Sequence, residues 1–175
     1  MLEEIDENIW QASKDFVLPG TNVNFGNRVT VVKLSNGDVW VHSPIEFCPE
    51  IRERVLHIGS PKHLVAPNLF HYMHFNKWAQ TFKEAATYGA PGLTKKRKEL
   101  SFQHTLSNEV PAAWAQDFDQ HVCEGSPGLN EVVFLHKPTR TLIITDFSFN
   151  FDPPKGLLQK FFWKMSRWPP VLESW

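Results

Sequence analysis

Two histidines and one aspartate are the residues of this chain whose types and spacing could support metal chemistry. His71 and His74 lie three positions apart, shortly after the apolar run His63–Val65, and Asp146 ends the apolar run that begins at Thr141. Imidazole and carboxylate groups are common ligands of zinc and of non-haem iron. Loops at strand ends hold such groups exposed and rigidly placed. His71, His74 and Asp146 therefore form the candidate metal site, for which zinc and iron are the suitable ions.

If His71 and His74 lie on one helix, their spacing places both imidazoles on the same side, where they can converge on one ion. With Asp146 they leave coordination positions open for water and substrate. Zinc held in this way would polarise a carbonyl or phosphoryl group and lower the pKa of its water to about 7. The alternative is that both histidines cap and pack the start of a helix, because Met73 and Phe75 make this segment apolar.

Three further residues are candidates for the lining of a pocket at the same edge. His42 ends the β-branched and aromatic run that begins at Val39, and Asn68 comes three residues before His71. Ser126 lies in a loop flanked by Gly125 and Gly128. The sequence around Ser126 is not the Gly-x-Ser-x-Gly turn of a serine nucleophile, so we predict a pocket residue there rather than a catalytic one.

The elements that must position these residues alternate between strands and helices. Two hairpins are predicted, one pairing Val29–Leu34 with Val39–Val41 and one pairing Val132–Leu135 with Leu142–Thr145. Apolar residues at helical spacing predict helices over Glu50–Ile58, with Pro49 before it and Gly59 after it, and over Phe75–Phe82. A basic helix is predicted to begin at Pro91 and to end at Lys98. Hairpins mixed with crossover helices indicate mixed sheets covered by helices rather than one purely parallel sheet.

Composition excludes several classes of function. The 175 residues suffice for one domain, and 42% hydrophobic and 21% charged residues describe an ordinary globular protein. A net charge of −1 gives no reason to expect a nucleic-acid partner. Cys48 and Cys123 fit no zinc ribbon, and Met1–Gln11 has no signal-peptide pattern, so we expect reduced thiols and a cytoplasmic location. No run approaches the roughly 18 apolar residues of a membrane-spanning helix.

A last helix is predicted over residues 156–167, with an apolar stripe beside a basic one. The apolar stripe is Leu158, Phe161, Phe162 and Met165, and the basic stripe is Lys160, Lys164 and Arg167. Helices at a membrane surface have this pattern, and so do helices that pack on a sheet. As the partner we expect a small-molecule ligand. Peripheral membrane contact through this helix is the weaker alternative.

Four segments resemble, in type and in order, the metal-bearing loops of the metallo-β-lactamase superfamily. Asp38–Pro44 stands where that superfamily has an Asp-Thr-Gly-like turn, and Ser60–His74 where it has the His-x-His-x-Asp-His loop. Gly125–Gly128 resembles the Gly-His-x-x-Gly loop, and Leu142–Asp146 resembles the strand whose aspartate bridges two metals. Between Ile5 and Phe151 the chain is thus similar to this superfamily and, more narrowly, to an uncharacterised domain-of-unknown-function family within it.

The resemblance implies an αββα sandwich, with two mixed β-sheets face to face and helices on the outer faces. It implies a single domain over residues 1–175, with truncation at the C-terminus as an alternative because the chain is shorter than such domains usually are. Of the superfamily's metal ligands only Asp146 carries over cleanly, since Asn68 and Phe70 stand near expected ligand positions. We therefore expect a degenerate site in a non-catalytic or ligand-binding descendant, with a metal-dependent hydrolase using a reduced mononuclear site as the alternative.

Overall fold

The computed structural model describes residues 1–17, 24–124 and 128–147 of the chain. Within these ranges the helices are α1 (Pro49–Ile58), α2 (Phe75–Thr81) and α3 (Leu93–Lys96). The strands are β1 (Glu3–Asp6), β2 (Ile9–Lys14), β3 (Asn27–Lys33), β4 (Val39–His42), β5 (Pro61–Ala66), β6 (Ala86–Gly89), β7 (His104–Thr105), β8 (Phe118–Val122), β9 (Val132–His136) and β10 (Thr141–Ile143).

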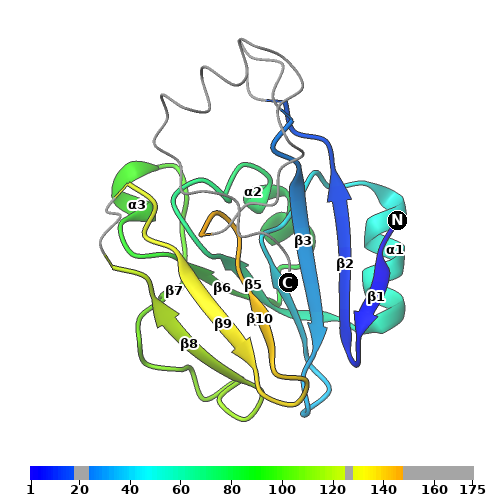
Figure 1. The fold of residues 1–175 in the computed structure, drawn as a ribbon. Coiled ribbons are helices and arrows are strands. Elements are labelled where there is room, and N and C mark those ends of the chain that lie inside the picture. Colours follow the sequence, from blue (N-terminus) through cyan, green and yellow to red (C-terminus); the bar gives the residue numbers. More distant parts are fainter. Residues whose placement is uncertain (18–23, 125–127, 148–175) are drawn as a thin grey trace, which may run out of the picture.

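Strands β1 to β7 form one sheet in the order of the chain (Figure 1). The pairs from β1 to β4 are antiparallel, and those from β4 to β7 are parallel. Parallel neighbours need a crossover connection, and α1, α2 and α3 lie in these connections. The C-terminal ends of β4, β5 and β6 therefore meet at one edge of the sheet, which is where the candidate residues were expected.

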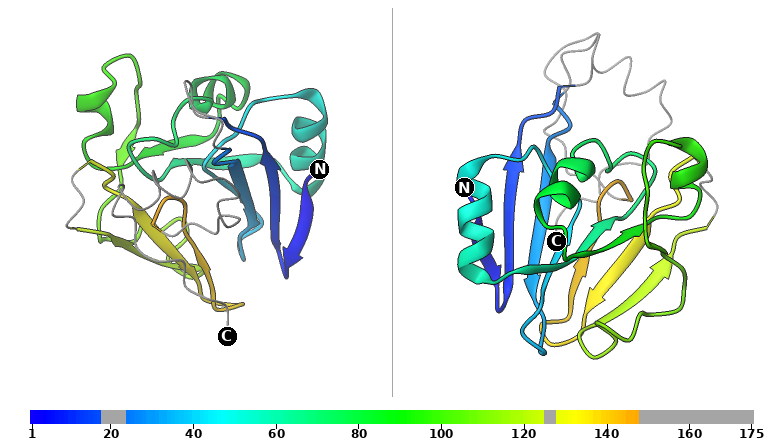
Figure 2. Two further views of the ribbon diagram at one scale, coloured as in Figure 1. Left: turned by 45° about the horizontal axis from the view of Figure 1, so that its top comes forward. Right: turned by 180° about the vertical axis from the view of Figure 1, so that it is seen from behind.

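A second sheet, of order β10-β9-β8, is antiparallel throughout and packs against the first (Figures 1 and 2). Seen from behind in Figure 2, α1 and α2 lie in front of the seven-stranded sheet, on its other face. Both predicted hairpins are confirmed, as β3 with β4 and as β9 with β10. Only the larger sheet is mixed, and the helix predicted over residues 156–167 lies outside the described residues.

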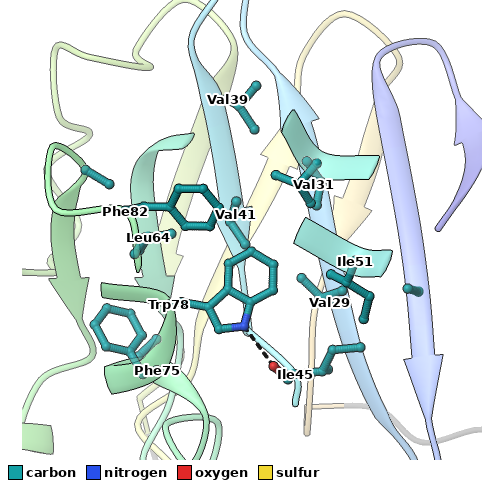
Figure 3. Close-up of a cluster of buried hydrophobic side chains, with 14 of the residues drawn as sticks. Val29, Val31, Val39, Val41, Ile45, Ile51, Leu64, Phe75, Trp78 and Phe82 are labelled. Atoms are coloured by element: carbon teal, nitrogen blue, oxygen red, sulfur yellow. Dashed lines mark hydrogen bonds between the residues drawn. The ribbon is translucent and has the colours of Figure 1, made fainter. Parts of the chain in front are cut away.

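The core between the large sheet and the helices is mainly aliphatic, and it contains the aromatic rings of Phe75, Trp78 and Phe82 (Figure 3). Trp78 of α2 is fully buried against sheet residues such as Val41 and Leu64, and its indole N–H donates to the Ile45 carbonyl at 2.8 Å. Buried tryptophan needs such an acceptor for its polar atom. This contact ties α2 to the segment that follows β4, close to the strand ends.

The core between the two sheets is aromatic. Trp40 of β4 lies 4.6 Å from Phe118 and 5.0 Å from Phe134 between ring centroids, across the interface of the two sheets. Trp114 also contacts Trp40, at 6.2 Å and nearly edge-on. Side chains alternate along a strand, so Val39 and Val41 face the helices while Trp40 and His42 face the second sheet. His42 is thereby placed inside the sandwich.

The sequence-based elements differ from the structure at several places. Strands β1, β2 and β7 were not predicted, because Glu3–Asp6 is exposed throughout, β2 alternates only weakly and β7 has only two residues. The helix expected over Pro91–Lys98 is only the four-residue α3, which follows Gly92 in the left-handed region at φ +84°. Within the described ranges no helix is long and apolar enough to cross a membrane.

Candidate functional site at the strand ends

Three loops are fastened to one another where β4 and β5 end and β9 begins. The Ser43 backbone N–H, just after β4, donates to the Val65 carbonyl at 2.9 Å. The Val132 N–H, at the start of β9, donates to the Pro67 carbonyl at 2.9 Å. The two sheets are therefore joined by main-chain bonds at this end, and the side chains on these loops are held in fixed positions.

Asn68 is the centre of the site and is 0% exposed. Its side-chain oxygen Oδ1 accepts the backbone N–H groups of Phe70 at 2.8 Å and of His71 at 2.9 Å. An Asx turn of this kind fixes the turn after β5. It also fixes the orientation of the amide, because only an oxygen can accept two N–H groups. The Asn68 Nδ2 group therefore points the other way.

Oxygen atoms surround the Asn68 amide nitrogen. Nδ2 lies 2.8 Å from Asp146 Oδ2, 2.9 Å from Thr145 Oγ1 and 3.4 Å from Glu131 Oε2. Its two N–H donors are thus directed at the carboxylates of Asp146 and Glu131 and at the Thr145 hydroxyl. This buried donor helps to hold two carboxylates close together.

Glu131, directly before β9, is 0% exposed and accepts two backbone N–H groups. Its Oε1 atom accepts from Thr145 N at 2.6 Å, and its Oε2 atom from Asp146 N at 2.8 Å. Burial raises the pKa of Glu131, the Asp146 charge raises it further, and the backbone donors oppose both effects. Glu131 therefore fixes the loop after β10 and, with it, the position of Asp146.

His71 connects the loops after β4 and β10. Its Nδ1 atom lies 2.6 Å from Ser43 Oγ, and its Nε2 atom lies 3.2 Å from Asp146 Oδ1. The side chains of His71 and Asp146 are 17% and 20% exposed, whereas Ser43 is 1% exposed. Ser43, His71 and Asp146 thus form a continuous hydrogen-bonded chain from the interior to a partly open surface.

His42 lies beside this chain and is itself buried. Its ring stacks on Trp40 at 5.2 Å and meets Phe134 edge-on at 5.5 Å between centroids. Among the described residues its Nε2 atom has no hydrogen-bond partner. Burial, and to a smaller degree the charge of His71, lowers the pKa of His42 to about 3, so the ring is neutral at pH 7.

The other predicted site residues are placed differently. Helix α2 begins at Phe75, so His71 and His74 lie in the turn before it and do not share a helix face. Burial lowers the pKa of His74, the Glu46 charge opposes this effect, and the Lys14 charge adds to it. Ser126 lies outside the described residues. The structure thus brings His42, Asn68, His71 and Asp146 to one end of the sandwich, with His74 facing another set of charges.

The donor set around Asp146 does not fit a metal ion as the side chains are arranged. A metal needs lone pairs that converge on one point, whereas Asp146 faces an amide N–H donor of Asn68 and the ring nitrogen of His71. In the part of the chain that the structure describes, no three His, Cys, Asp or Glu side chains are grouped so that they could hold an ion. A metal at His71, His74 and Asp146 remains a prediction for titration to test.

Ser43, Glu131 and Thr145 belong to the site but were not predicted from the sequence. Each is a single polar residue next to a strand, and no spacing distinguishes it from an ordinary loop residue. The sequence holds a weak indication for Glu131 only. A carboxylate directly before an apolar strand costs free energy to bury, so it needs hydrogen-bond donors nearby. A surface hollow of about 540 Å³ lies elsewhere, lined by Leu2, Glu4, Trp10, Glu53, Arg54, His57 and Ile58.

Solved structures with the same fold include several metallo-β-lactamases. The DIM-1 metallo-β-lactamase superposes with a TM-score of 0.67 at 16% identity, over 87% of this chain and 72% of that one. A metallo-β-lactamase from Hirschia baltica gives 0.61 at 8% identity, over 81% and 68%. FIM-1 from Pseudomonas aeruginosa, in its mono-zinc form, gives 0.57 at 9% identity, over 77% and 63%. At these identities the likeness establishes the fold alone.

Sequence comparison gives the family. No curated protein matches the chain. A profile for a domain of unknown function matches residues 6–155, which include every strand and helix from β2 to β10 and the site around Asn68, His71 and Asp146. The chain therefore belongs to the family described as "Domain of unknown function (DUF4336)", and it has the metallo-β-lactamase fold.

Proposed function

We propose that this protein is a ligand-binding descendant of the metallo-β-lactamase fold whose degenerate site works without a metal. One observation carries the proposal: the Asn68 amide nitrogen stands among the oxygen atoms of Asp146, Thr145 and Glu131. In a metal site a cation would balance neighbouring carboxylates. Here hydrogen-bond donors do so, and the amide cannot rotate away because its oxygen accepts two backbone N–H groups.

The site retains polar atoms that a small molecule could bind. His71 and Asp146 are partly exposed, and the buried Nε2 atom of His42 has no partner among the described residues. Buried polar atoms without partners cost about 1–3 kcal/mol, so a ligand that satisfies one gains affinity. A small polar molecule with both donor and acceptor groups matches this combination.

A thermal-shift series with zinc, iron(II) and manganese, each with and without chelator, tests the metal-free proposal. A metal at about 100 times its dissociation constant stabilises the native state by about 2.7 kcal/mol, or about 5–10 °C for a chain of this size. We expect no shift of that size with any of the three ions. The alternative, a hydrolase with a mononuclear site at His71, His74 and Asp146, requires one.

Two variants distinguish the site from adventitious binding. His71→Ala removes the central imidazole, and His121→Ala removes an exposed imidazole of β8. A metal-dependent rise in melting temperature that His71→Ala abolishes and His121→Ala retains would overturn the proposal. A rise that both variants retain would come from other surface groups and would leave the site metal-free.

A further inference from the structure

The chain of Ser43, His71 and Asp146 has the connectivity of a nucleophile, a base and an orienting acid. Ser43 Oγ lies 2.6 Å from His71 Nδ1, and His71 Nε2 lies 3.2 Å from Asp146 Oδ1. A nucleophile within hydrogen-bond reach of a base, itself oriented by a third group, characterises covalent catalysis on unrelated folds. The three residues come from the loops after β4, β5 and β10, so the fold alone brings them together.

The partners of Asp146 determine which ring nitrogen of His71 carries the proton. Asp146 Oδ2 accepts from the fixed Asn68 amide, and Oδ1 faces His71 Nε2. An ionised carboxylate only accepts hydrogen bonds, so Nε2 carries the hydrogen and Nδ1 keeps its lone pair. Ser43 Oγ must then donate to His71 Nδ1. The proton of the serine hydroxyl already points at a base.

The backbone at Ser43 is strained. Its φ is +55°, in the left-handed region that non-glycine residues enter at a cost of about 1–3 kcal/mol. The N–H bond to Val65 and the parallel pairing of β4 with β5 hold it there. Strain of this kind at the end of a strand directs a side chain out of the sheet, and it concentrates at functional positions. Here it directs the hydroxyl to His71.

We propose that Ser43 is an acyl acceptor and that the site hydrolyses small carboxylic esters through Ser43, His71 and Asp146. This inference rests on the ligand site proposed above and adds a covalent step to it. Ser43 is 1% exposed while His71 and Asp146 are partly open, which favours a small acyl group such as acetyl. Asp146 acts as a positioning residue because it fixes the tautomer of His71.

The steps balance with an ester and water as the reactants. Ser43 Oγ attacks the carbonyl carbon, its proton passes to His71 Nδ1, and the carbon–oxygen bond to the leaving alcohol breaks as that alcohol takes the proton from Nδ1. Water then attacks the acyl-serine and gives a proton to Nδ1. The bond from the acyl carbon to Ser43 Oγ breaks, the proton returns to Oγ, and the carboxylic acid is released.

Treating the full chain with 4-nitrophenyl acetate in the presence of chelator tests this step. We expect intact-mass spectrometry to detect one added acetyl group and peptide mapping to place it on Ser43. His71→Ala should slow acetylation by about 10²-fold or more, as loss of a general base does. Asp146→Asn should slow it too, and should lower the fraction of His71 rings that carry the proton on Nε2, read from ¹⁵N NMR.

Ser43→Ala and Ser43→Gly should both lose the adduct, and glycine accepts the φ of +55° without strain if the alanine variant does not fold. Ser35→Ala, at a serine remote from His71, should keep it. No adduct, or an adduct that persists in both Ser43 variants, would overturn the inference. The two proposals fail in different experiments. A rise in melting temperature with metal that depends on His71 refutes the metal-free site. A missing acetyl adduct in the presence of chelator refutes only the acyl-serine.

Discussion

A serine lies at each end of strand β4, and the two serines differ in their partners. Before β4, Ser35 donates its N–H to Asp117 Oδ1 at 2.8 Å and its hydroxyl to Asp117 Oδ2 at 3.0 Å. After β4, the Ser43 hydroxyl meets an imidazole, which in turn meets Asp146. The first pairing joins a turn of one sheet to the start of β8 in the other, and each carboxylate oxygen has its donor.

The Ser43 end contains more polar groups than are needed to join the loops. Two carboxylates, Glu131 and Asp146, lie within hydrogen-bond distance of the Asn68 amide nitrogen. The Nε2 atom of His42 has no partner among the described residues. Fully satisfied buried networks rigidify a fold, whereas unsatisfied atoms cost stability. The contacts at the Ser35 end join the two sheets, and the binding role that we propose belongs to the Ser43 end.

The largest effect expected is for Asn68→Asp. A third carboxylate beside Glu131 and Asp146 leaves an uncompensated buried charge, and we expect a loss of about 3–5 kcal/mol in the free energy of unfolding, measured with urea at pH 7. Asn76→Asp makes the same change at an exposed position in the first turn of α2 and should cost nothing. Equal effects in the two variants would mean that the Asn68 amide does not balance the carboxylates.

The second-largest effect concerns the pH dependence of the free energy of unfolding, to which His42 contributes at the Ser43 end of β4. The folded pKa of His42 is lowered to about 3 from 6.5, so between these values the unfolded chain binds a proton that the folded chain does not. Stability is therefore lost as the pH falls below 6.5, by about 1.4 kcal/mol per pH unit. His42→Phe should remove this part of the slope in urea unfolding between pH 6.5 and 5. Parallel slopes for the two proteins would contradict the burial of a neutral His42.

The smallest effect compares alanine with glycine at the two serines. Ser43 has a φ of +55°, whereas Ser35 is not among the residues with positive φ. Glycine should therefore be better than alanine at position 43 by about 1 kcal/mol and worse than alanine at position 35. Both alanine variants should lose about 1 kcal/mol for the hydroxyl bond. Thermal unfolding of the four variants ranks their melting temperatures. The same ranking of alanine and glycine at both positions would mean that the backbone of Ser43 is not strained.

Much of the fold could be predicted because its signals are local. The hairpins β3–β4 and β9–β10 have alternating strands around short turns, and α1 has Pro49 at its start and Gly59 after its end. Strand β1 could not be predicted, because an exposed strand of four residues is specified by its pairing with β2 and not by its own pattern.

The site could be predicted only where chemistry coincides with a strand end. Asn68, His71 and Asp146 follow apolar strands and are in contact. Ser43 and Glu131 were missed, because their roles come from contacts between loops that are far apart in the sequence, which no sequence spacing records. His74 was grouped with His71 on the assumption of a shared helix, yet both lie in the turn before α2.

The tautomer of His71 tests the central claim, a site completed by hydrogen bonds instead of a metal, most directly. Long-range ¹H–¹⁵N correlation spectra of protein labelled with ¹⁵N-histidine, assigned with His71→Ala, distinguish a ring protonated at Nε2 from one protonated at Nδ1. We expect the ring proton on Nε2, bonded to Asp146, and signals that do not change on adding zinc. A proton on Nδ1, with a bare Nε2 that responds to zinc, would contradict it.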